Sequence, residues 1–293
     1  MKEKTRNIEK NIANFFELKK YLHKCFENLE DYSPNEETEF VSKALSLEKE
    51  KLLLNCSLSK KQVKKVLALS KKRLGGEPTG KIFHNAFFFY DEFYINRYVL
   101  CPRKETELLV EKALQYIEKQ EKKNLTVLDL CCGSGAIGLT IAKYAKKTLS
   151  VLLTDISKKA IRVSKINQRK LKVKENTKIL RSNMFSNLKK GLLFDIIVCN
   201  PPYIETDNLK NLARGVKDFD PKIALNGGSD GLKFYREIAV EAKKFLSKSG
   251  KIFLEIGYNQ KESIRKIFEK NGFSIESFKD YSNNDRIIIA SQN

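Results

Sequence analysis

From Arg103 to its last residues the chain alternates short apolar stretches with segments whose apolar residues recur at helical spacing. Strands and helices in this order predict a mostly parallel sheet with helices on both faces, because parallel strands need a long crossover between them. No helical segment separates the last two strands, so we expect the final strand to pair antiparallel. The expected order is TVLDL, a helix over about 136–146, LSVLLTD, a helix over about 157–171, KILRS, FDIIVC, a helix over about 231–246, KIFLEI, a helix over about 260–270, FSIESFKDY and RIIIAS.

Residues 1–74 have a different pattern. Their apolar residues recur at helical spacing, and SPNEE and LSKKQ resemble helix starts capped by Ser33 and Ser59, so we expect a small helical domain. The segment GGEPTG marks its end, and the aromatic and β-branched residues that follow predict one or two β-hairpins with a turn near 90–92. We therefore expect a helical domain over 1–74, a hairpin linker over 75–102 and an α/β domain over 103–293.

The segment TVLDLCCGSGAIGLTIA places a glycine-rich turn between a strand and an amphipathic helix. Gly133, Gly135 and Gly138 allow a ligand to approach the backbone. About 20 residues further on, Asp155 ends the next strand, where a carboxylate can accept hydrogen bonds from both hydroxyls of a ribose. For the loop alone, a tight strand-to-helix turn without a ligand is the alternative. With Asp155 in place, dinucleotides and S-adenosylmethionine both suit the pattern.

Two residues of the loop separate these cofactors. Cys131 stands where a dinucleotide loop would have its first glycine, and Asp129 precedes it. A carboxylate beside a pyrophosphate is unfavourable, whereas one near the ammonium group of a methionine moiety is favourable. Together with the motif that ends the strand FDIIVC, this selects S-adenosyl-L-methionine as the cofactor.

The strand FDIIVC ends in Asn200-Pro201-Pro202-Tyr203, a stiff turn at the edge where open α/β sheets bind ligands. The Oδ1 atom of Asn200 and the carbonyl oxygen of Pro201 can each accept one N–H of a substrate amide or exocyclic amine. The nitrogen lone pair is then aimed at a sulfonium methyl group. Tyr203 can stack on the planar group. For Pro-Pro-Tyr alone, a surface turn is the alternative.

The composition limits the class of protein but leaves one partner open. No stretch approaches the roughly 18 apolar residues of a membrane span, and the N-terminus lacks an apolar signal core, so we expect a cytoplasmic protein. Six cysteines without paired spacings predict reduced thiols rather than disulfides or a metal site. His23 and His84 are expected to pack or to lie at the surface. The net charge of +20 agrees with nucleic-acid binding and equally with a lysine-rich composition.

Nine segments in order give the chain a resemblance to a known family. The sequence between about residues 35 and 291 is similar to that of the HemK/PrmC-type methyltransferases, which modify the glutamine of the Gly-Gly-Gln motif in peptide-chain release factors. The segments that carry the resemblance are an acid-rich first helix, RLGGEP, YVLCPRKETELLVE, DLCCGSGAIG, TDIS, NPPYI, DFDPKIALNGGSDGLKFY, LEIGYNQ and DYSNNDRIIIA.

The resemblance implies a Rossmann-like class I methyltransferase domain with a seven-stranded sheet, and an N-terminal helical domain that helps to hold the release factor. We further expect a monomer without a membrane partner, for which direct nucleic-acid binding is possible but not required. Its site residues, carried over by position, are Cys131, Cys132, Gly133, Ser134 and Gly135 as the cofactor loop, Asp155 as the ribose acceptor, Asn183 and Met184 beside the adenine, and Asn200, Pro201, Pro202 and Tyr203 as the glutamine pocket. Asp129 and Asn200 are further expected to contact the cofactor.

Some residues depart from the family pattern, and two other functions stay open. Asn183 and Met184 replace a frequent acid and apolar residue: the amide oxygen can still accept from the adenine amino group, and the thioether gives apolar cover. Lys104 replaces a usual proline. The first alternative function is amino-methylation of adenine in DNA or guanine in RNA, because the N-P-P-Y turn also suits a flipped base. The second is a nucleic-acid-binding module without turnover, against which the intact Asp155 and Asn200 argue.

Overall fold

The computed structural model describes residues 12–54 and 57–293 and divides the chain into two units. The first contains the chain up to His84 together with Ala213–Phe219, and the second contains Asn85–Leu212 and Asp220–Asn293. The chain thus changes unit at residue 84, between the boundaries at 74 and 102 expected from the sequence, which stay a prediction for the functional domains. No helix of the described residues is both long and apolar enough to cross a membrane.

The first unit is helical, as the spacing of its apolar residues predicts. Phe15, Leu18, Leu22 and Phe26 recur along one face of its first described helix and are fully buried. They pack on residues of the other helices to form a core of their own. The helices are α2 (Phe15–Phe26), α3 (Glu36–Leu45), α4 (Lys49–Leu54), α5 (Lys60–Leu74), α6 (Thr79–Ile82) and, from the later segment, α10 (Arg214–Lys217).

The two expected helix caps of this unit have different outcomes. Ser59 caps α5 as predicted: its Oγ accepts from the backbone N–H of Gln62, and Gln62 Oε1 accepts in return from the backbone N–H of Ser59. The expectation for Ser33 is wrong. Asn35 is the N-cap of α3, in a left-handed conformation and without a side-chain hydrogen bond to the helix. An Asn adopts that conformation more easily than most residues, which moves the helix start by two positions.

A buried ion pair joins the helices of this unit. Arg73, near the end of α5, is almost fully buried, and its Nε donates to Glu36 Oε1 at 2.6 Å. Its Nη2 also donates to Asp31 Oδ1 at 2.7 Å. A buried guanidinium is tolerated when it is paired and hydrogen-bonded in this way, so the network fixes the start of α3 against the end of α5.

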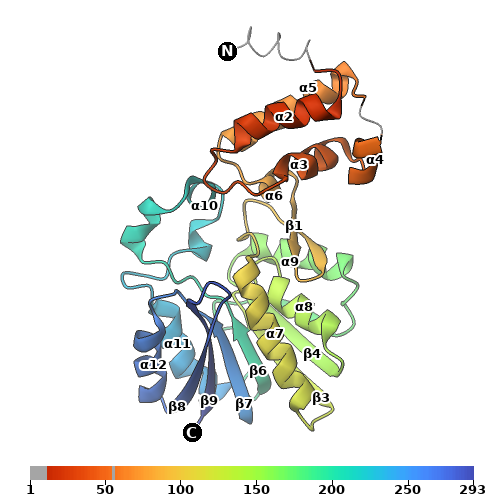
Figure 1. Ribbon diagram of the computed structural model, residues 1–293. Helices are drawn as coiled ribbons and strands as arrows, with labels where there is room; N and C mark the ends of the chain where they lie inside the picture. The colour runs from red at the N-terminus through yellow and green to blue at the C-terminus, as the bar shows by residue number, and fades with distance from the viewer. Residues whose placement is uncertain (1–11, 55–56) are drawn as a thin grey trace. The chain divides into compact units, whose positions relative to one another are not determined.

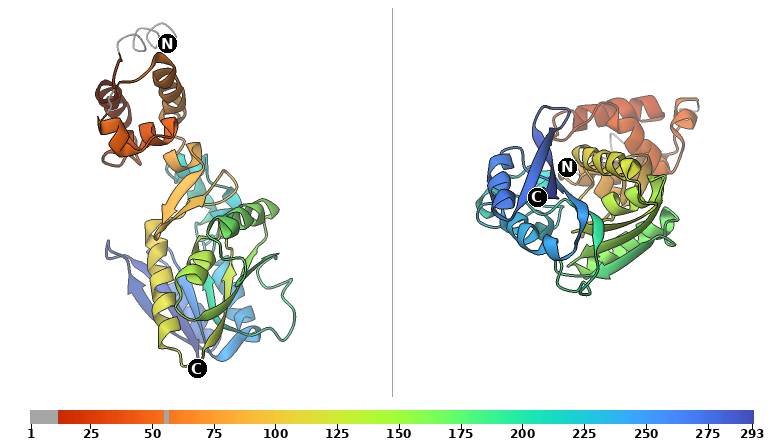
Figure 2. Two further views of the ribbon diagram at one scale, coloured as in Figure 1. Left: turned by 90° about the vertical axis from the view of Figure 1, so that its right-hand side faces the viewer. Right: turned by 90° about the horizontal axis from the view of Figure 1, so that it is seen from below.

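The second unit is built on a seven-stranded sheet with the strand order β5-β4-β3-β6-β7-β9-β8 (Figure 1). The pairings from β5 to β7 are parallel, and β9 is antiparallel to both of its neighbours, as the sequence predicts. The strands are β3 (Asn124–Leu130), β4 (Thr148–Asp155), β5 (Thr177–Arg181), β6 (Phe194–Cys199), β7 (Leu246–Glu255), β8 (Phe273–Lys279) and β9 (Asp285–Gln292). A separate hairpin, β1 (Asn85–Phe88) with β2 (Asp91–Tyr94), lies beside α9 (Figure 2).

Helices cover both faces of this sheet. Alternate residues of the strands enter two hydrophobic clusters, one with α7, α8, α9 and the hairpin and one with α11 and α12. Because both faces are covered, β6 is buried along its whole length. The helices are α7 (Lys104–Lys119), α8 (Ala136–Tyr144), α9 (Lys158–Lys170), α11 (Lys233–Glu241) and α12 (Lys261–Lys270), and short 3-10 turns occupy Thr206–Asn211, Lys222–Ala224 and Ala242–Lys244.

Two elements differ from the sequence-based expectation. Helix α7 was not predicted, although acidic residues in its first turn and a buried stripe are typical of an amphipathic helix. The helix expected over 231–246 is shorter, because α11 ends at Glu241 and a 3-10 turn leads into β7 at Leu246.

The strand order places the two sequence motifs side by side. From β3 the chain proceeds outward through β4 to β5, and then returns to the other side of β3 with β6. Ligands of open α/β sheets bind outside the carboxyl ends of the strands at such a reversal. Leu130, the last residue of β3, pairs with Cys199, the last residue of β6. The glycine-rich loop and the N-P-P-Y turn therefore begin at neighbouring positions.

Candidate active site

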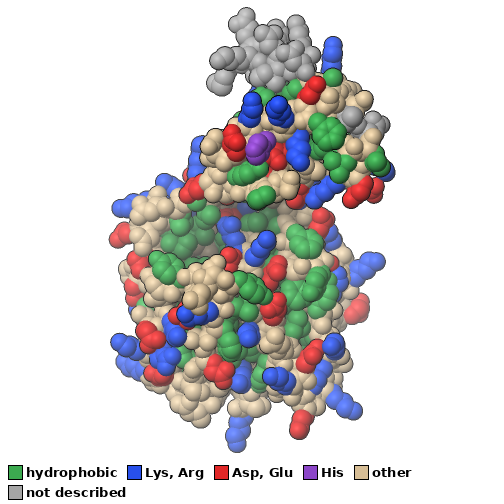
Figure 3. Space-filling view, in the orientation of Figure 1, with side chains coloured by type: hydrophobic (Ala, Val, Ile, Leu, Met, Phe, Trp, Pro, Cys, Tyr) green, Lys and Arg blue, Asp and Glu red, His purple; other side chains and the backbone are tan. Residues whose placement is uncertain are grey.

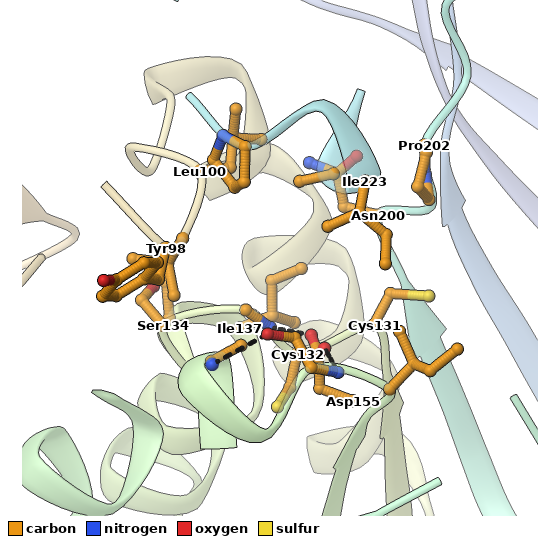
Figure 4. Close-up of a pocket in the computed structure, with 18 of the residues that line it drawn as sticks. Tyr98, Leu100, Cys131, Cys132, Ser134, Ile137, Asp155, Asn200, Pro202 and Ile223 are labelled. Carbon is orange, nitrogen blue, oxygen red and sulfur yellow. Dashed lines mark hydrogen bonds between the residues drawn. The ribbon is translucent and has the colours of Figure 1, made fainter. Parts of the chain in front are cut away.

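A cavity of about 310 Å³ lies at this reversal, entirely within the second unit. Its lining contains nine of the predicted cofactor and substrate residues and part of the chain before α7 (Figure 4). The predicted residues that line it are Cys131, Cys132, Gly133, Ser134, Asp155, Asn183, Met184 and Asn200, together with Pro202 of the substrate motif. A volume of this size is in the range of small-molecule sites.

The loop after β3 approaches the cavity with its backbone. Cys131 has φ 56° and Gly133 has φ 55°, both left-handed. Such a conformation costs little at a glycine but is uncommon for a cysteine and is found mainly at functional sites. A Cβ at Gly133 would meet only the carbonyl oxygen of Cys131, at 3.9 Å. The Sγ of Cys131 lies 3.6 Å from Met184 Sδ, so the loop meets the turn after β5 through two sulfur atoms.

Asp155 ends β4 and faces this loop. Its Oδ2 accepts from the backbone N–H of Gly133 at 2.9 Å, and its Oδ1 accepts from that of Ser157 at 2.7 Å. Burial raises the pKa of Asp155, while the two backbone hydrogen bonds lower it, with a net increase. Each carboxylate oxygen keeps a free lone pair, so the side chain can accept two further hydrogen bonds from a ribose.

Asp129 lies beneath the loop rather than in the cavity lining. It is fully buried in β3, and its Oδ2 accepts from the backbone N–H of Gly138 at 2.8 Å. A Cβ at position 138 would stand 2.7 Å from that oxygen, so only glycine allows the contact. Burial raises the pKa of Asp129 to about 8, and the charge of Asp155 acts in the same direction. Its contact with the ammonium group of the cofactor stays a prediction.

The turn after β5 forms the side of the cavity next to Cys131. Asn183 is exposed and Met184 is buried, in a left-handed backbone with φ 45°. The hydroxyl of Ser182 donates to the carbonyl oxygen of Met184 at 2.7 Å and holds this turn. The positions suit an amide at the rim and an apolar side chain deeper in the cavity, as predicted for the two sides of an adenine.

The N-P-P-Y turn is divided between cavity and core. Asn200 and Pro202 line the cavity, on the side opposite Asp155 and Cys132 (Figure 4). Tyr203 packs instead against the hydrophobic cluster of α11 and α12, and burial raises its pKa strongly. Pro201, Tyr203, Asp129 and Gly135 are thus the predicted site residues outside the lining. Stacking of Tyr203 on a substrate stays a prediction.

Behind Asn200 lies a chain of hydrogen bonds. Asn200 Nδ2 donates to Thr106 Oγ1 at 3.4 Å, and Thr106 Oγ1 donates to Glu255 Oε2 at 2.6 Å. Glu255 is the last residue of β7 and is buried. The pKa of Glu255 is raised to about 7, mainly by burial and also by the charge of Glu105. Hydrogen bonding from Thr106 and Asn200 and the charge of Arg286 act in the opposite direction.

Several lining residues were not predicted. Tyr98 and Leu100 come from the segment before α7, and Ile223 from the 3-10 turn after α10 (Figure 4). The first two lie within YVLCPRKETE, which the sequence singles out only through its resemblance to a family segment. The others follow predicted residues or come from neighbouring elements: Val99, Pro102, Arg103, Thr106, Ala136, Ile137, Ile156, Ser157, Ala160, Ser182, Pro221, Ala224, Lys233 and Phe234.

The residues present fit S-adenosylmethionine. Gly133 lines the cavity without a side chain, Asp155 keeps acceptors for two hydroxyls, and Asn200 lines the same cavity. Within the described residues, no group of three or more His, Cys, Asp and Glu side chains is arranged to hold a metal ion. The free acceptors of Asp155 suit an organic cofactor with a ribose.

Comparison with known proteins gives the same result. Residues 104–215 match the family described as "Methyltransferase small domain". The "Release factor glutamine methyltransferase" of Clostridium acetobutylicum is 44% identical over 234 residues, which cover 79% of this chain and 80% of the relative. The protein of the same name from Fusobacterium nucleatum is 36% identical over 297 residues, covering 98% of this chain and 80% of the relative.

Solved structures support the fold. The hMettl16 catalytic domain, solved in complex with the MAT2A 3′UTR hairpin 6, superimposes with a TM-score of 0.52 at 13% identity, over 68% of this chain and 74% of that one. Such a low identity shows a shared class I methyltransferase fold and nothing about the substrate. Identity above 30% along most of the sequence is decisive for the family: this chain belongs to the release factor glutamine methyltransferases.

Proposed function

We propose that this chain transfers the methyl group of S-adenosylmethionine to the side-chain amide nitrogen of the glutamine in the Gly-Gly-Gln motif of peptide-chain release factors. One observation carries the proposal: the loop after β3 and the Asn200 turn after β6 open on the same cavity. A cofactor held at the first therefore lies next to an amide held at the second.

The residues on the cofactor side of the cavity would bind and orient S-adenosylmethionine. S-adenosylmethionine supplies an electrophilic methyl group on a sulfonium centre. Asp155 would accept the ribose hydroxyls, Asn183 and Met184 would border the adenine, and the backbone from Cys131 to Gly135 would surround the methionine end. All these groups are held by hydrogen bonds or packing in the second unit, so little reorganisation accompanies binding.

The residues on the substrate side of the cavity would hold the glutamine amide nitrogen, which is a poor nucleophile. An amide nitrogen has its lone pair delocalised into the carbonyl group, so its reaction depends on orientation and on stabilisation of the positive charge that develops. Asn200 Oδ1 and the carbonyl oxygen of Pro201 would each accept one N–H of the glutamine amide. Both acceptors favour the charged nitrogen over the neutral one, which lowers the barrier.

The substrate is a protein, and we place the first unit in its recognition. The catalytic candidates all lie beyond Arg103, so the helical unit is free to hold the body of the release factor. On the face shown in Figure 3, basic and acidic side chains are interspersed, which is less favourable for a nucleic-acid surface than a single basic patch would be. We further propose that the protein acts as a monomer in the cytoplasm, where release factors act.

The test offers a labelled methyl donor to a release factor, a DNA duplex and an RNA separately. We expect methylation of the release factor alone, lost when its target glutamine is replaced by asparagine, because the nitrogen then retracts by one methylene, more than about 1 Å. Methylation of DNA or RNA but not of the release factor would identify an amino-methyltransferase of nucleic acids instead.

A further inference from the structure

We propose that Glu255 and Thr106 act as positioning residues that hold the side-chain amide of Asn200 in one of its two orientations, with Nδ2 turned toward Thr106 and Oδ1 presented to the substrate. This inference rests on the proposed function, because the presented oxygen matters only if it accepts from a substrate NH2.

The three side chains come from three elements that are far apart in the sequence. Thr106 lies in the first turn of α7, Asn200 follows β6 and Glu255 ends β7. Thr106 and Glu255 are both more than nine-tenths buried. The Tyr235 hydroxyl donates to the backbone carbonyl oxygen of Glu255 at 2.8 Å and so fixes the main chain from which the carboxylate extends.

The direction of each hydrogen bond follows from the chemistry of the groups. An ionised carboxylate can only accept, so Thr106 must use its single hydroxyl hydrogen for Glu255 Oε2, 2.6 Å away. Thr106 Oγ1 can then only accept from its other neighbour. That neighbour is the Asn200 side chain at 3.4 Å, which must therefore present its NH2 group and not its oxygen. Glu255 therefore sets the orientation of the Asn200 amide through the hydroxyl of Thr106.

If the side-chain amide of Asn200 were reversed, its hydrogen bond to Thr106 would be lost. With Oδ1 turned toward Thr106, two oxygen atoms without a hydrogen between them would face each other beside a carboxylate. The NH2 group would face the cavity, where it would repel the N–H groups of a substrate amide. A donor in place of the acceptor removes the stabilisation of positive charge on the substrate nitrogen.

Glu255 can enforce this order only while it is ionised. Its surroundings hold Arg286 on β9, Glu105 on α7 and the hydroxyl of Tyr203 after β6, in addition to Thr106 and Asn200. With a pKa of about 7, Glu255 takes up a proton just below neutral pH. A protonated carboxyl group can donate to Thr106, so the threonine hydrogen is released and Asn200 can reverse. Since Glu255 is outside the cavity lining, it acts through Asn200 and not on the substrate.

The experiment compares Thr106→Val, Thr106→Ser and Glu255→Gln with the full-length wild type in methylation of a release factor. We expect Thr106→Val to lower kcat about tenfold or more while KM and the Kd for S-adenosylmethionine change less than about threefold. Thr106→Ser keeps the hydroxyl and should recover most of kcat. The wild-type kcat should fall below about pH 7, and Glu255→Gln should have a low kcat without that fall.

The matched control is Thr140→Val. Thr140 is fully buried on α8, and its hydroxyl has no partner among the described residues, so the same substitution removes a buried hydroxyl outside the chain of hydrogen bonds. We expect wild-type kcat. Suppose that the wild type methylates release factors. An unchanged kcat in Thr106→Val, or an effect of that substitution only on KM or Kd, would then overturn this inference and leave the proposed function intact. A wild type inactive on release factors would instead count against the proposed function.

A measurement that needs no turnover tests the orientation directly. In protein labelled with ¹⁵N-asparagine, the side-chain NH2 signal of Asn200, assigned by its absence in Asn200→Ala, reports the hydrogen bond to Thr106. We expect this signal to shift with a midpoint near pH 7 and to move in Thr106→Val but not in Thr140→Val. A signal indifferent to both pH and Thr106→Val would overturn the inference even if no substrate were found.

Discussion

One carboxylate buried in the helical unit and two buried near the cavity of the sheet unit have opposite kinds of partner. In the helical unit, Glu36 is 7% exposed and pairs with the guanidinium of Arg73, which is buried more deeply. In the sheet unit, Asp129 and Glu255 are exposed by 0% and 2%, and neither forms an ion pair with a described residue. Their partners are a backbone N–H and a hydroxyl, and burial raises both pKa values, to about 8 and about 7.

This difference distinguishes a buried carboxylate that stabilises the fold from one that serves a binding or catalytic site. A buried charge with a buried counter-charge gives up its free lone pairs and fixes the elements it joins. A buried carboxylate without an ion-pair partner keeps an adjustable proton and direction-setting hydrogen bonds, which is the state found at binding and catalytic sites. Substitution in the first unit should therefore change stability, and substitution around the cavity should change affinity, rate or pH dependence.

The largest effect is expected where the buried ion pair is broken. Arg73→Leu leaves Glu36 buried without its cation, so the free energy of unfolding of the first unit should fall by about 3–5 kcal/mol. Urea denaturation followed by circular dichroism measures the change. As a control, Lys51→Ala removes an exposed partner of Glu48 and should cost less than about 1 kcal/mol. Equal losses for the two variants would break the comparison.

A change at Asn200 should alter rate rather than stability. Asn200→Ala removes the oxygen that accepts from the substrate nitrogen as charge develops, so kcat should fall by a factor on the order of 100 or more. The affinity for S-adenosylmethionine should stay within a few fold of the wild-type value. Single-turnover methylation and calorimetry measure the two quantities. A loss of cofactor affinity equal to the loss in rate would place Asn200 in cofactor binding instead.

Asp155 should govern cofactor affinity. Asp155→Ala removes an acceptor for two ribose hydroxyls, at a cost of roughly 1–3 kcal/mol, so the affinity for S-adenosylmethionine should fall about tenfold or more. Asp155→Asn keeps one acceptor oxygen and should lose less. Isothermal calorimetry gives both values, and an unchanged affinity in Asp155→Ala would remove this residue from the cofactor site.

The smallest effect concerns pH. Burial raises the pKa of Asp129 from 3.8 to about 8, so the folded state binds its proton more tightly than the unfolded state. This contribution to stability is complete below about pH 4 and is lost as the pH rises toward 8. Asp129→Asn cannot ionise, so its stability relative to wild type should rise by about 1 kcal/mol or more between pH 5 and pH 8. Urea titrations at the two pH values measure this difference, and parallel curves would contradict the assigned burial cost.

Much of the sheet and the two motif positions follow from sequence, because a buried strand and a glycine or proline turn are local signals. The strand FDIIVC has the predicted bounds, Phe194–Cys199. Pairing between strands is not local. The contact of Thr106 with Glu255 joins residues 149 positions apart, and the sequence singles out their segments only through the family resemblance, without pairing them. The segment Ala213–Phe219 could not be assigned to the first unit for the same reason.

Local rules also compete with one another. The cap at Ser59 is correctly predicted, and Gln62 at the required spacing completes a capping box there. At α3, Pro34 follows Ser33, and the helix begins only after the left-handed Asn35. At the site, Tyr203 is partly buried and packs against the cluster of α11 and α12, a contact that the local motif does not predict, and its stacking on a substrate stays a prediction.

The division of the first unit between two stretches of chain has a consequence for synthesis on the ribosome. Its later stretch packs on the earlier one, since a Cβ at Gly76 would meet the side chain of Arg214 at 3.0 Å and one at Gly215 would lie 3.4 Å from Pro78. Domains commonly fold in order as they emerge during translation. Here the helical unit can acquire its last piece only after residue 219 of 293 has emerged, when β3 to β6 of the sheet have already been made. The helical unit therefore cannot be complete until most of the strands of the sheet unit have been synthesised.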